Sequence, residues 1–206
     1  REGAPFAEER SMKGKYIKGR SITYDGSQLR SHYAFTEHDV QGDSVVAFRG
    51  PCRVGVEDLV DLEDRKKKAA IYSEEMAHFI VELFGRGLDI TLAIQRLLLC
   101  VIKDVIEELK PELFINRRGD DLYIEVEVDE GEEENRKLTV SVATASPVST
   151  LIHTGINISS RNTPVPTLGL DDLEIPVDDF ILKVLQGFIN EMKGMELARC
   201  KVRAVT

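Results

Sequence analysis

The sequence predicts an α+β fold with a mainly antiparallel sheet flanked by helices. Segments with strand character and segments with helix character come in separate runs rather than in strict alternation, which favours antiparallel pairing over repeated βαβ units. A long apolar segment at residues 88–110 predicts a central helix, and an amphipathic segment near the C-terminus predicts a second one. The strand-like segments between these helices supply most of the expected sheet.

The first third of the chain is expected to provide strands and an early helix. Residues 15–29 indicate a strand or hairpin that ends at the turn 25–26. Residues 43–50 are a short apolar strand, which runs into a sharp loop at 49–52. Residues 73–84, SEEMAHFIVELF, carry apolar side chains at helical spacing, so this segment is predicted to be a helix.

The rest of the chain is expected to form the central helix, a meander and a C-terminal helix. Pro111 ends the helix of residues 88–110. The acidic segment 129–135 predicts a solvated hairpin loop, residues 177–192 an amphipathic helix, and residues 200–205 an edge strand. The expected strands of the meander and of its continuation are 113–117, 120–128, 137–144 and 151–158.

Composition and length narrow the class of protein. The net charge of -9 disfavours a broad phosphate-binding face, so general nucleic-acid binding is not expected. No apolar run reaches the roughly 18 residues of a membrane-spanning helix, so no membrane partner is expected. The 206 residues fit one domain, which we place at 12–206 after a polar N-terminal extension at 1–11. Oligomerisation stays open.

The cysteines bear on the cellular compartment and on nucleophilic chemistry. Cys52, Cys100 and Cys200 are too few and too scattered for a disulfide framework or a zinc ribbon, which favours a reducing, cytoplasmic location. Cys52 follows a candidate ligand loop, but nothing in the sequence lowers its pKa, so a structural thiol is favoured over a nucleophile.

The main candidate site is the expected hairpin formed by residues 137–144 and 151–158. Alternation places Lys137 and Ser141 on one face of the first strand and His153, Gly155 and Asn157 on one face of the second. If these two polar faces coincide, they form a floor of small side chains that leaves room for a ligand. The alternative is a polar face that simply meets water.

Two further candidates are weaker. Arg49 and Gly50, at the end of a strand, suit contact with a carboxylate or phosphate, although a surface turn gives the same pattern. Glu74, His78 and Glu82 are spaced by four, which on a helix puts them on one face. That set lacks a third reliable metal ligand, so a solvated helix face is favoured and no metal site is predicted.

Several segments together resemble the family catalogued as domain of unknown function 366. They include YDGSQLRSHYAF, GDSVVAFRGPC, RRGDDLYIEV and KLTVSVATASPVSTLIHTGINI, and the resemblance runs in order from Met12 to the C-terminus. More distantly, this family is similar to the biotin and lipoate protein ligases, the octanoyltransferases and the class II aminoacyl-tRNA synthetases. The resemblance implies an antiparallel sheet flanked by helices.

The resemblance also implies roles for the candidate residues. Arg49 and Gly50 match a loop over the acyl or nucleotide group, and Lys137 matches a catalytic lysine that contacts the acyl carbonyl and phosphate. His153, Gly155 and Asn157 match a strand near the acyl tail. ATP is the cofactor that the ligases imply. The chain departs from the octanoyltransferases because residues 162–169 hold no cysteine, and it lacks the full glycine-rich nucleotide loop of the ligases.

Three functional hypotheses therefore stand. In the first, the protein is an acyltransferase or ATP-dependent ligase in which Lys137 acts on a small-molecule carboxylate or acyl group. Arg49, Gly50, Ser141, His153, Gly155 and Asn157 would then bind the substrate. In the second, the same scaffold is a non-catalytic module that binds a metabolite or a peptide. A tRNA-linked accessory role is a third hypothesis, against which the acidic balance counts.

Overall fold

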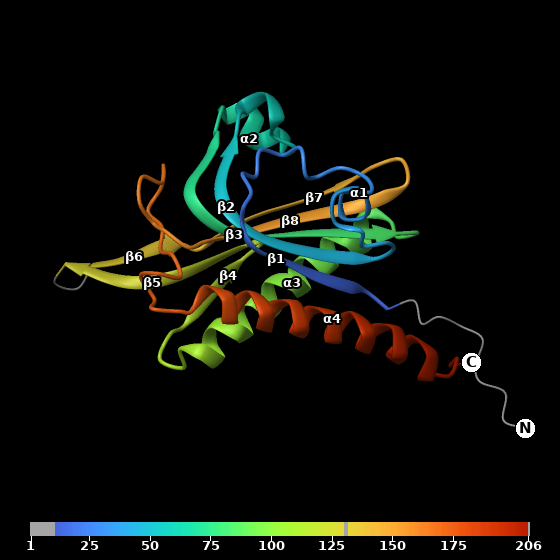
Figure 1. The fold of residues 1–206 in the computed structure, drawn as a ribbon. Helices are drawn as coiled ribbons and strands as arrows, with labels where there is room; N and C mark the ends of the chain where they lie inside the picture. The colour runs from blue at the N-terminus through green and yellow to red at the C-terminus, as the bar shows by residue number, and fades with distance from the viewer. Residues whose placement is uncertain (1–10, 130–131, 206) are drawn as a thin grey trace, which may run out of the picture.

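The computed structural model describes residues 11–129 and 132–205. It contains two sheets and two long helices, with short helical segments in the connections (Figure 1). The strands are β1 Lys13–Ser21, β2 Ser44–Val54, β3 Ile71–Phe84, β4 Ile115–Arg118, β5 Asp121–Asp129, β6 Glu132–Lys137, β7 Thr139–Ala145 and β8 Ser149–Asn157. The helical segments are α1 Tyr33–His38, η1 Val56–Asp58, α2 Leu62–Lys67, α3 Leu88–Leu109 and α4 Val177–Lys201.

The main sheet has five strands in the order β1-β2-β3-β8-β7, and the smaller sheet has the order β4-β5-β6. Strands β1 and β2 are parallel, whereas every other neighbouring pair is antiparallel. In Figure 1, α3 and α4 lie on one side of the main sheet. The end of β2, the start of β3 and the connection 55–70 between them, which includes η1 and α2, form an arm that rises on the other side. We call it the β2–β3 arm. The expected α+β class with a mainly antiparallel sheet flanked by helices is confirmed.

The two long helices follow the predicted apolar patterns. Leu98, Leu99 and Ile102 of α3 and Phe180 and Phe188 of α4 are all fully buried in one core cluster against the sheet. Burying a large apolar side chain contributes about 1.5–3 kcal/mol, so this face holds much of the fold together. Helix α4 continues to Lys201, beyond the predicted end, and the edge strand expected at 200–205 is wrong.

The helix predicted at residues 73–84 is also wrong, because this segment is part of strand β3. β3 pairs with β2 on one side and with β8 on the other, so it lies in the middle of the sheet. Both of its faces are buried: Met76 and Ile80 belong to one core cluster and Phe79 to the cluster under the helices. A strand that is apolar on both faces lacks the two-residue alternation that marks a half-exposed strand, and helical spacing appears in it by coincidence.

The predicted loop at 49–52 is instead a bulged part of β2, where the pairing register shifts between Gly50 and Cys52. A Cβ atom added to Gly50 would lie 2.1 Å from the carbonyl oxygen of Ile22. The close approach that this glycine permits is therefore to the chain's own backbone. The Ile22 amide also donates to the carbonyl of Arg49 at 2.9 Å.

The expected meander is divided between the two sheets. Lys137 is the last residue of β6, and β7 begins at Thr139, so Lys137 does not open the second strand as predicted. Leu138 between them is fully buried. Its amide donates to Leu122 of β5 at 2.8 Å, and its carbonyl accepts from Asn157 of β8 at 3.0 Å. One residue therefore carries the chain from the small sheet into the large one.

The acidic hairpin loop expected at 129–135 is shorter than predicted, because β6 already begins at Glu132. Its remaining tip, Glu130 and Gly131, lies outside the described residues, as do residues 1–10 of the expected N-terminal extension.

Replacing Gly50 with alanine is expected to lower the free energy of unfolding by about 1–3 kcal/mol, the range found for overpacked sites, because the new methyl group meets the Ile22 carbonyl. The matched control is Gly194→Ala on α4, where an added Cβ meets nothing within 4 Å. That change is expected to be neutral or stabilising, since alanine favours a helix over glycine. Chemical denaturation of both variants measures the free energy of unfolding. Equal changes in the two variants would contradict the close approach of Gly50 to the Ile22 carbonyl.

Candidate functional site

A cavity of about 480 Å³ lies over the edge of the main sheet formed by β7 and β8. Its walls come from β7, β8, the loop at 163–167, the turn between β4 and β5, and the β2–β3 arm with η1 and α2. The arm rises on the side of the sheet away from α3 and α4 (Figure 1). Its apolar lining includes Val54, Leu59, Ile71, Met76, Val140 and Val142.

The register of the β7–β8 pair corrects the predicted polar floor. Val140 lies opposite Gly155, Val142 opposite His153, and Ser141 opposite Thr154. Residues directly opposite each other point to the same face of a sheet. His153 and Gly155 therefore share their face with two valines, and Ser141 belongs to the other face. The two predicted polar faces do not coincide, because the register is offset by one residue from the one that would bring them together.

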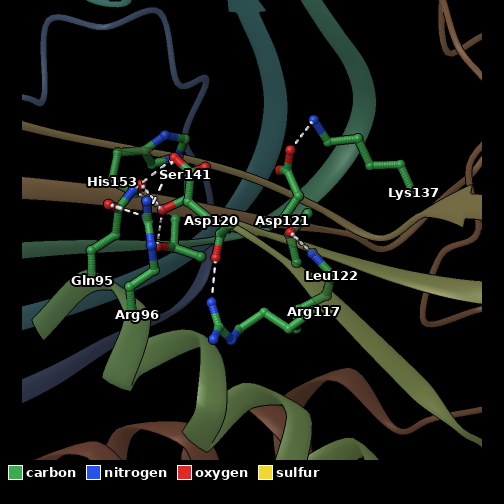
Figure 2. A network of polar contacts seen from close by, with 12 residues as sticks. Gln95, Arg96, Arg117, Asp120, Asp121, Leu122, Lys137, Ser141 and His153 are labelled. Atoms are coloured by element: carbon green, nitrogen blue, oxygen red, sulfur yellow. Dashed lines mark hydrogen bonds and ion pairs between the residues drawn. The ribbon is translucent and has the colours of Figure 1, made fainter. Parts of the chain in front are cut away.

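Ser141 ties helix α3 to the sheet. Its hydroxyl oxygen lies 2.9 Å from Gln95 Nε2, 2.9 Å from Thr154 Oγ1 and 3.1 Å from the His153 carbonyl (Figure 2). Ser141 borders the cavity at the edge strand. Three contacts within the protein already occupy its hydroxyl group, so its direct role is to hold α3 against β7.

His153 lines the cavity as the end of a hydrogen-bond chain. Its Nε2 atom lies 3.1 Å from Nδ1 of His78, whose Nε2 atom lies 3.1 Å from the carbonyl oxygen of Gly50. The Tyr24 ring stacks on His153 with 3.6 Å between the ring centroids. Burial lowers the pKa of His78 to about 4 and that of His153 well below its ordinary value. Both imidazoles are therefore neutral at pH 7.

Two further polar groups at the cavity have no partner in the protein. Tyr24 and Asn157 are each 4% exposed and both line the cavity. Within the described ranges, neither the Tyr24 hydroxyl nor the Asn157 side-chain amide forms a hydrogen bond. Neither group is among the polar atoms that are shut off from solvent without a partner, so both open onto the cavity. They mark positions where a bound molecule can take the place of water as the partner.

Gly155 lies between His153 and Asn157 on the same face of β8. A Cβ atom added there would lie 2.9 Å from Met76 Cε and 3.3 Å from Val140 Cγ2. The space left by the missing side chain is thus filled by the chain's own apolar groups. Gly155 shapes the middle of the floor by letting the Met76 side chain approach the backbone of β8 closely.

Lys137 lies at the other end of the cavity, where its ammonium group forms an ion pair with Asp121. The Nζ–Oδ2 distance is 2.8 Å, and Figure 2 shows the two side chains pointing toward each other. The backbone of Lys137 is held by Pro166 and Leu168 through hydrogen bonds of 3.0 and 3.1 Å. Burial raises the pKa of the Asp121 carboxyl, and the nearby ammonium opposes that rise.

Arg49 does not reach this cavity. It pairs in register with Ala77, which lies on the helix side of β3, and its guanidinium contacts Glu75 at 2.7 Å and Asp178 of α4 at 3.7 Å. The predicted clamp on the anionic end of a ligand is therefore misplaced for this cavity, because alternation along β2 turns Arg49 to the opposite face. Gly50 contributes only its carbonyl group, through His78.

The set Glu74, His78 and Glu82 does not form a metal centre. On strand β3 a spacing of four residues separates successive members by about 13 Å, too far for a shared ion. Glu74 pairs with Arg161, and Glu82 accepts hydrogen bonds from the His32 amide and the Ser149 hydroxyl. No group of three candidate metal ligands occurs within residues 11–129 and 132–205.

The charges around the cavity are divided between two ends. The end near Lys137 also holds Asp120, which lies 3.6 Å from Arg96, so both aspartates there have a cationic partner. The arm contributes Asp58, Asp61 and Asp64 to the lining. The local field thus favours an anionic group near Lys137 rather than near the arm.

Sequence reasoning missed Tyr24 and the role of His78. Tyr24 sits just before the turn at 25–26 and forms an isolated bridge with Cys52, a pairing that no local pattern reveals. His78 was assigned to a helix face. The even spacing of Met76, His78 and Ile80 would have placed all three on one face of a strand, beside His153, had the segment been identified as β.

The chain matches the family described as Domain of unknown function (DUF366) over residues 12–203. It belongs to this family. An uncharacterized protein from Methanocaldococcus jannaschii, MJ0805, is 35% identical over 188 residues, which cover 88% of this chain and 80% of that protein. A solved structure of a protein of unknown function from Pyrococcus horikoshi has a TM-score of 0.85 at 36% identity, covering 95% of this chain and 100% of that one.

The DUF366 fold is also similar to that of biotin and lipoate protein ligases, as the sequence resemblance implied. A mutant biotin protein ligase from Aquifex aeolicus in complex with biotin gives a TM-score of 0.57 at 15% identity, covering 88% of this chain and 70% of that chain. A putative lipoate protein ligase from T. acidophilum gives 0.54 at 14% identity, with 89% and 86% covered. At these identities the likeness establishes the fold alone.

Within the described part of this DUF366 chain, no helix combines the length and the apolar character needed to cross a bilayer.

The buried histidine pair is expected to make stability depend on pH. The unfolded chain takes up protons on both imidazoles near their ordinary pKa of 6.5, whereas the folded protein keeps them neutral. The free energy of unfolding should therefore fall as the pH drops from about 6.5 toward 4, by about 1.4 kcal/mol per pH unit for each histidine. Denaturant titrations at a series of pH values measure this slope.

The control variants separate this pair from other groups. His78→Gln removes one titrating group and keeps a hydrogen-bond donor and an acceptor. The slope of the free energy of unfolding against pH should therefore fall by about 1.4 kcal/mol per pH unit, the contribution of one histidine. Gly194→Ala on α4, where an added Cβ meets nothing within 4 Å, changes no titrating group and should leave the slope unchanged. His38, whose pKa burial also lowers, contributes equally in all variants. A slope unaffected by His78→Gln would contradict the neutral pair.

Proposed function

We propose that this protein binds a small molecule with a carboxylate or acyl group in the cavity over β7 and β8. The observation that carries the proposal is that Tyr24 and Asn157 present polar groups without a hydrogen bond in the described chain to the same cavity that holds Lys137. The volume of about 480 Å³ lies within the range of small-molecule sites, which combine apolar walls with a few placed polar groups.

Lys137 is the group suited to the carboxylate or acyl oxygen. An ammonium has three donors, so an oxygen of the ligand can approach Nζ while Asp121 keeps its contact at 2.8 Å. Asn157 of β8 lies close by, because its backbone amide bonds to Leu138, the residue after Lys137. The same ammonium would stabilise negative charge that grows on a carbonyl oxygen during acyl activation. Because Arg49 lies on the other face of the sheet, Lys137 and Asn157 take its predicted place at the end of the cavity that receives the anionic group of the ligand. We call this end the anionic end.

The solved ligases of the same fold give this assignment a chemical context. One biotin protein ligase is described in complex with biotin and ATP, at a TM-score of 0.52 and 15% identity. Biotin carries a carboxylate, which is the kind of group that Lys137 suits. ATP-dependent activation of a bound acid is therefore the catalytic form of this proposal, with Lys137 as the catalytic residue and ATP as the cofactor.

A non-catalytic binding module is the second candidate, and the state of the thiols favours it over covalent acyl transfer. Cys52 is fully buried, and burial raises the pKa of its thiol to about 12. No cysteine occurs among the residues that line the cavity within the described chain. A thioester intermediate therefore has no nucleophile here, and binding alone or activation by ATP remain as the two forms to be separated.

Lys137→Ala is expected to weaken binding of an acid by roughly 10- to 100-fold, since a hydrogen bond to a charged group contributes about 1.5–3 kcal/mol. Octanoate, lipoate and biotin are suitable probes, each with and without ATP and magnesium. Thermal shifts identify the acid that binds, because a ligand stabilises the folded state by RT ln(1 + [L]/Kd). Calorimetric titration then gives the affinity independently of any change in stability.

The matched control is Lys183→Ala, which removes a surface lysine paired with Glu108 at 2.7 Å on the helix side and should leave affinity unchanged. Release of pyrophosphate in the presence of ATP and the acid, abolished by Lys137→Ala, would establish the ligase form. Binding without turnover would establish the module. An affinity that is the same in wild type and Lys137→Ala would refute the assignment of this end of the cavity.

A further inference from the structure

The hydrogen-bond chain that ends at His153 allows only one arrangement of protons. The Gly50 carbonyl can only accept, so Nε2 of His78 must carry the hydrogen of that 3.1 Å bond. In a neutral imidazole the other nitrogen is then bare, so Nδ1 of His78 accepts from Nε2 of His153 at 3.1 Å. It follows that Nδ1 of His153 carries no hydrogen.

The bare Nδ1 of His153 is a hydrogen-bond acceptor without a donor. No described residue donates to it, and His153 is 3% exposed and lines the cavity. Tyr24 covers the ring at a centroid distance of 3.6 Å, and Phe48 packs on His78 at 5.0 Å, so packing fixes the planes of both rings. The bonds from His78 to Gly50 and to His153 fix which edge of each ring carries the nitrogens. The acceptor is therefore fixed both in position and in kind.

This acceptor lies at the opposite end of the floor from the anionic end. His153 and Asn157 lie on one face of β8 and are four residues apart, which corresponds to about 13 Å. Between them, Met76 and Val140 cover Gly155 and make the middle of the floor apolar. The floor thus has one end suited to an acid, an apolar middle, and another end that accepts a hydrogen bond.

We infer that the ligand of this cavity is an elongated acid whose far end carries an N–H or O–H donor, and that this donor bonds to Nδ1 of His153. His78 is a positioning residue, because it sets which nitrogen of His153 is bare without touching the ligand. The inference rests on the proposed function for the placement of the acid. It adds that the far end of the cavity selects donors and rejects acceptors, since two acceptors facing each other would both stay unpaired.

The proton arrangement is tested first, without any ligand. Nitrogen NMR of the histidine side chains in the wild-type protein at pH 7 distinguishes bare from protonated ring nitrogens. The expected result is that Nδ1 is bare in both His78 and His153. A hydrogen on Nδ1 of His153 would overturn the inference, whatever acids the cavity binds.

Selectivity is tested with three probes that share one acid group: octanoate, 8-hydroxyoctanoate and 8-methoxyoctanoate. The hydroxyl compound is expected to bind at least about fivefold more tightly than the methoxy compound, the size of one net hydrogen bond. Equal binding of the two would overturn this inference while the carboxylate site stands. Failure of all three to bind would instead contradict the proposed function and the inference with it.

Two variants of the positioning residue complete the test. His78→Gln keeps a donor for Gly50 and an acceptor for His153, and should retain the preference for the hydroxyl probe. His78→Phe removes both, which frees His153 to place its hydrogen on Nδ1. The ratio of the affinities for the hydroxyl and methoxy probes should then fall toward one. A merely structural role would change stability in both variants and the hydroxyl preference in neither. An unchanged preference in a folded His78→Phe protein would therefore exclude the positioning role.

Discussion

The burial of β3 between β2 and β8 is the constraint on which both the fold and the candidate site depend. A strand in that position must satisfy its backbone through two neighbours, and any polar side chain on it must find a partner inside the protein. His78 meets this requirement by bonding to the Gly50 carbonyl on one side and to His153 on the other. The same burial keeps the imidazoles neutral and so gives the far end of the cavity a fixed polarity.

The second constraint is the passage from the small sheet to the large one at Leu138. Because this residue is bonded to β5 through its amide and to β8 through its carbonyl, the side chain before it is held where the two sheets meet. Lys137 and Asp121 are neighbours for this reason. Their ion pair, at 2.8 Å with side chains 27% and 21% exposed, is sheltered more than a surface pair and retains more of its electrostatic strength.

Sequence reasoning reached the fold class, both long helices and the β7–β8 hairpin, because apolar periodicity and turn residues report local structure well. It failed where partners far along the chain decide the outcome. β3 was mistaken for a helix since a central strand is apolar on both faces, and Arg49 was assigned to the site since the face of a strand depends on pairing. The polar floor failed for a related reason: alternation gives the two faces of each strand, but only the register says which faces meet.

The cavity draws on chain segments from Tyr24 to Thr167, and this has a consequence for how the site comes into being. No fragment shorter than residues 24–167 contains all of its walls, so it cannot be assembled by local contacts alone. Closing loops of such length costs entropy before any long-range contact compensates for it. The binding surface should therefore be among the last parts of the molecule to mature during folding, and shortening the protein from either side into this span would abolish it.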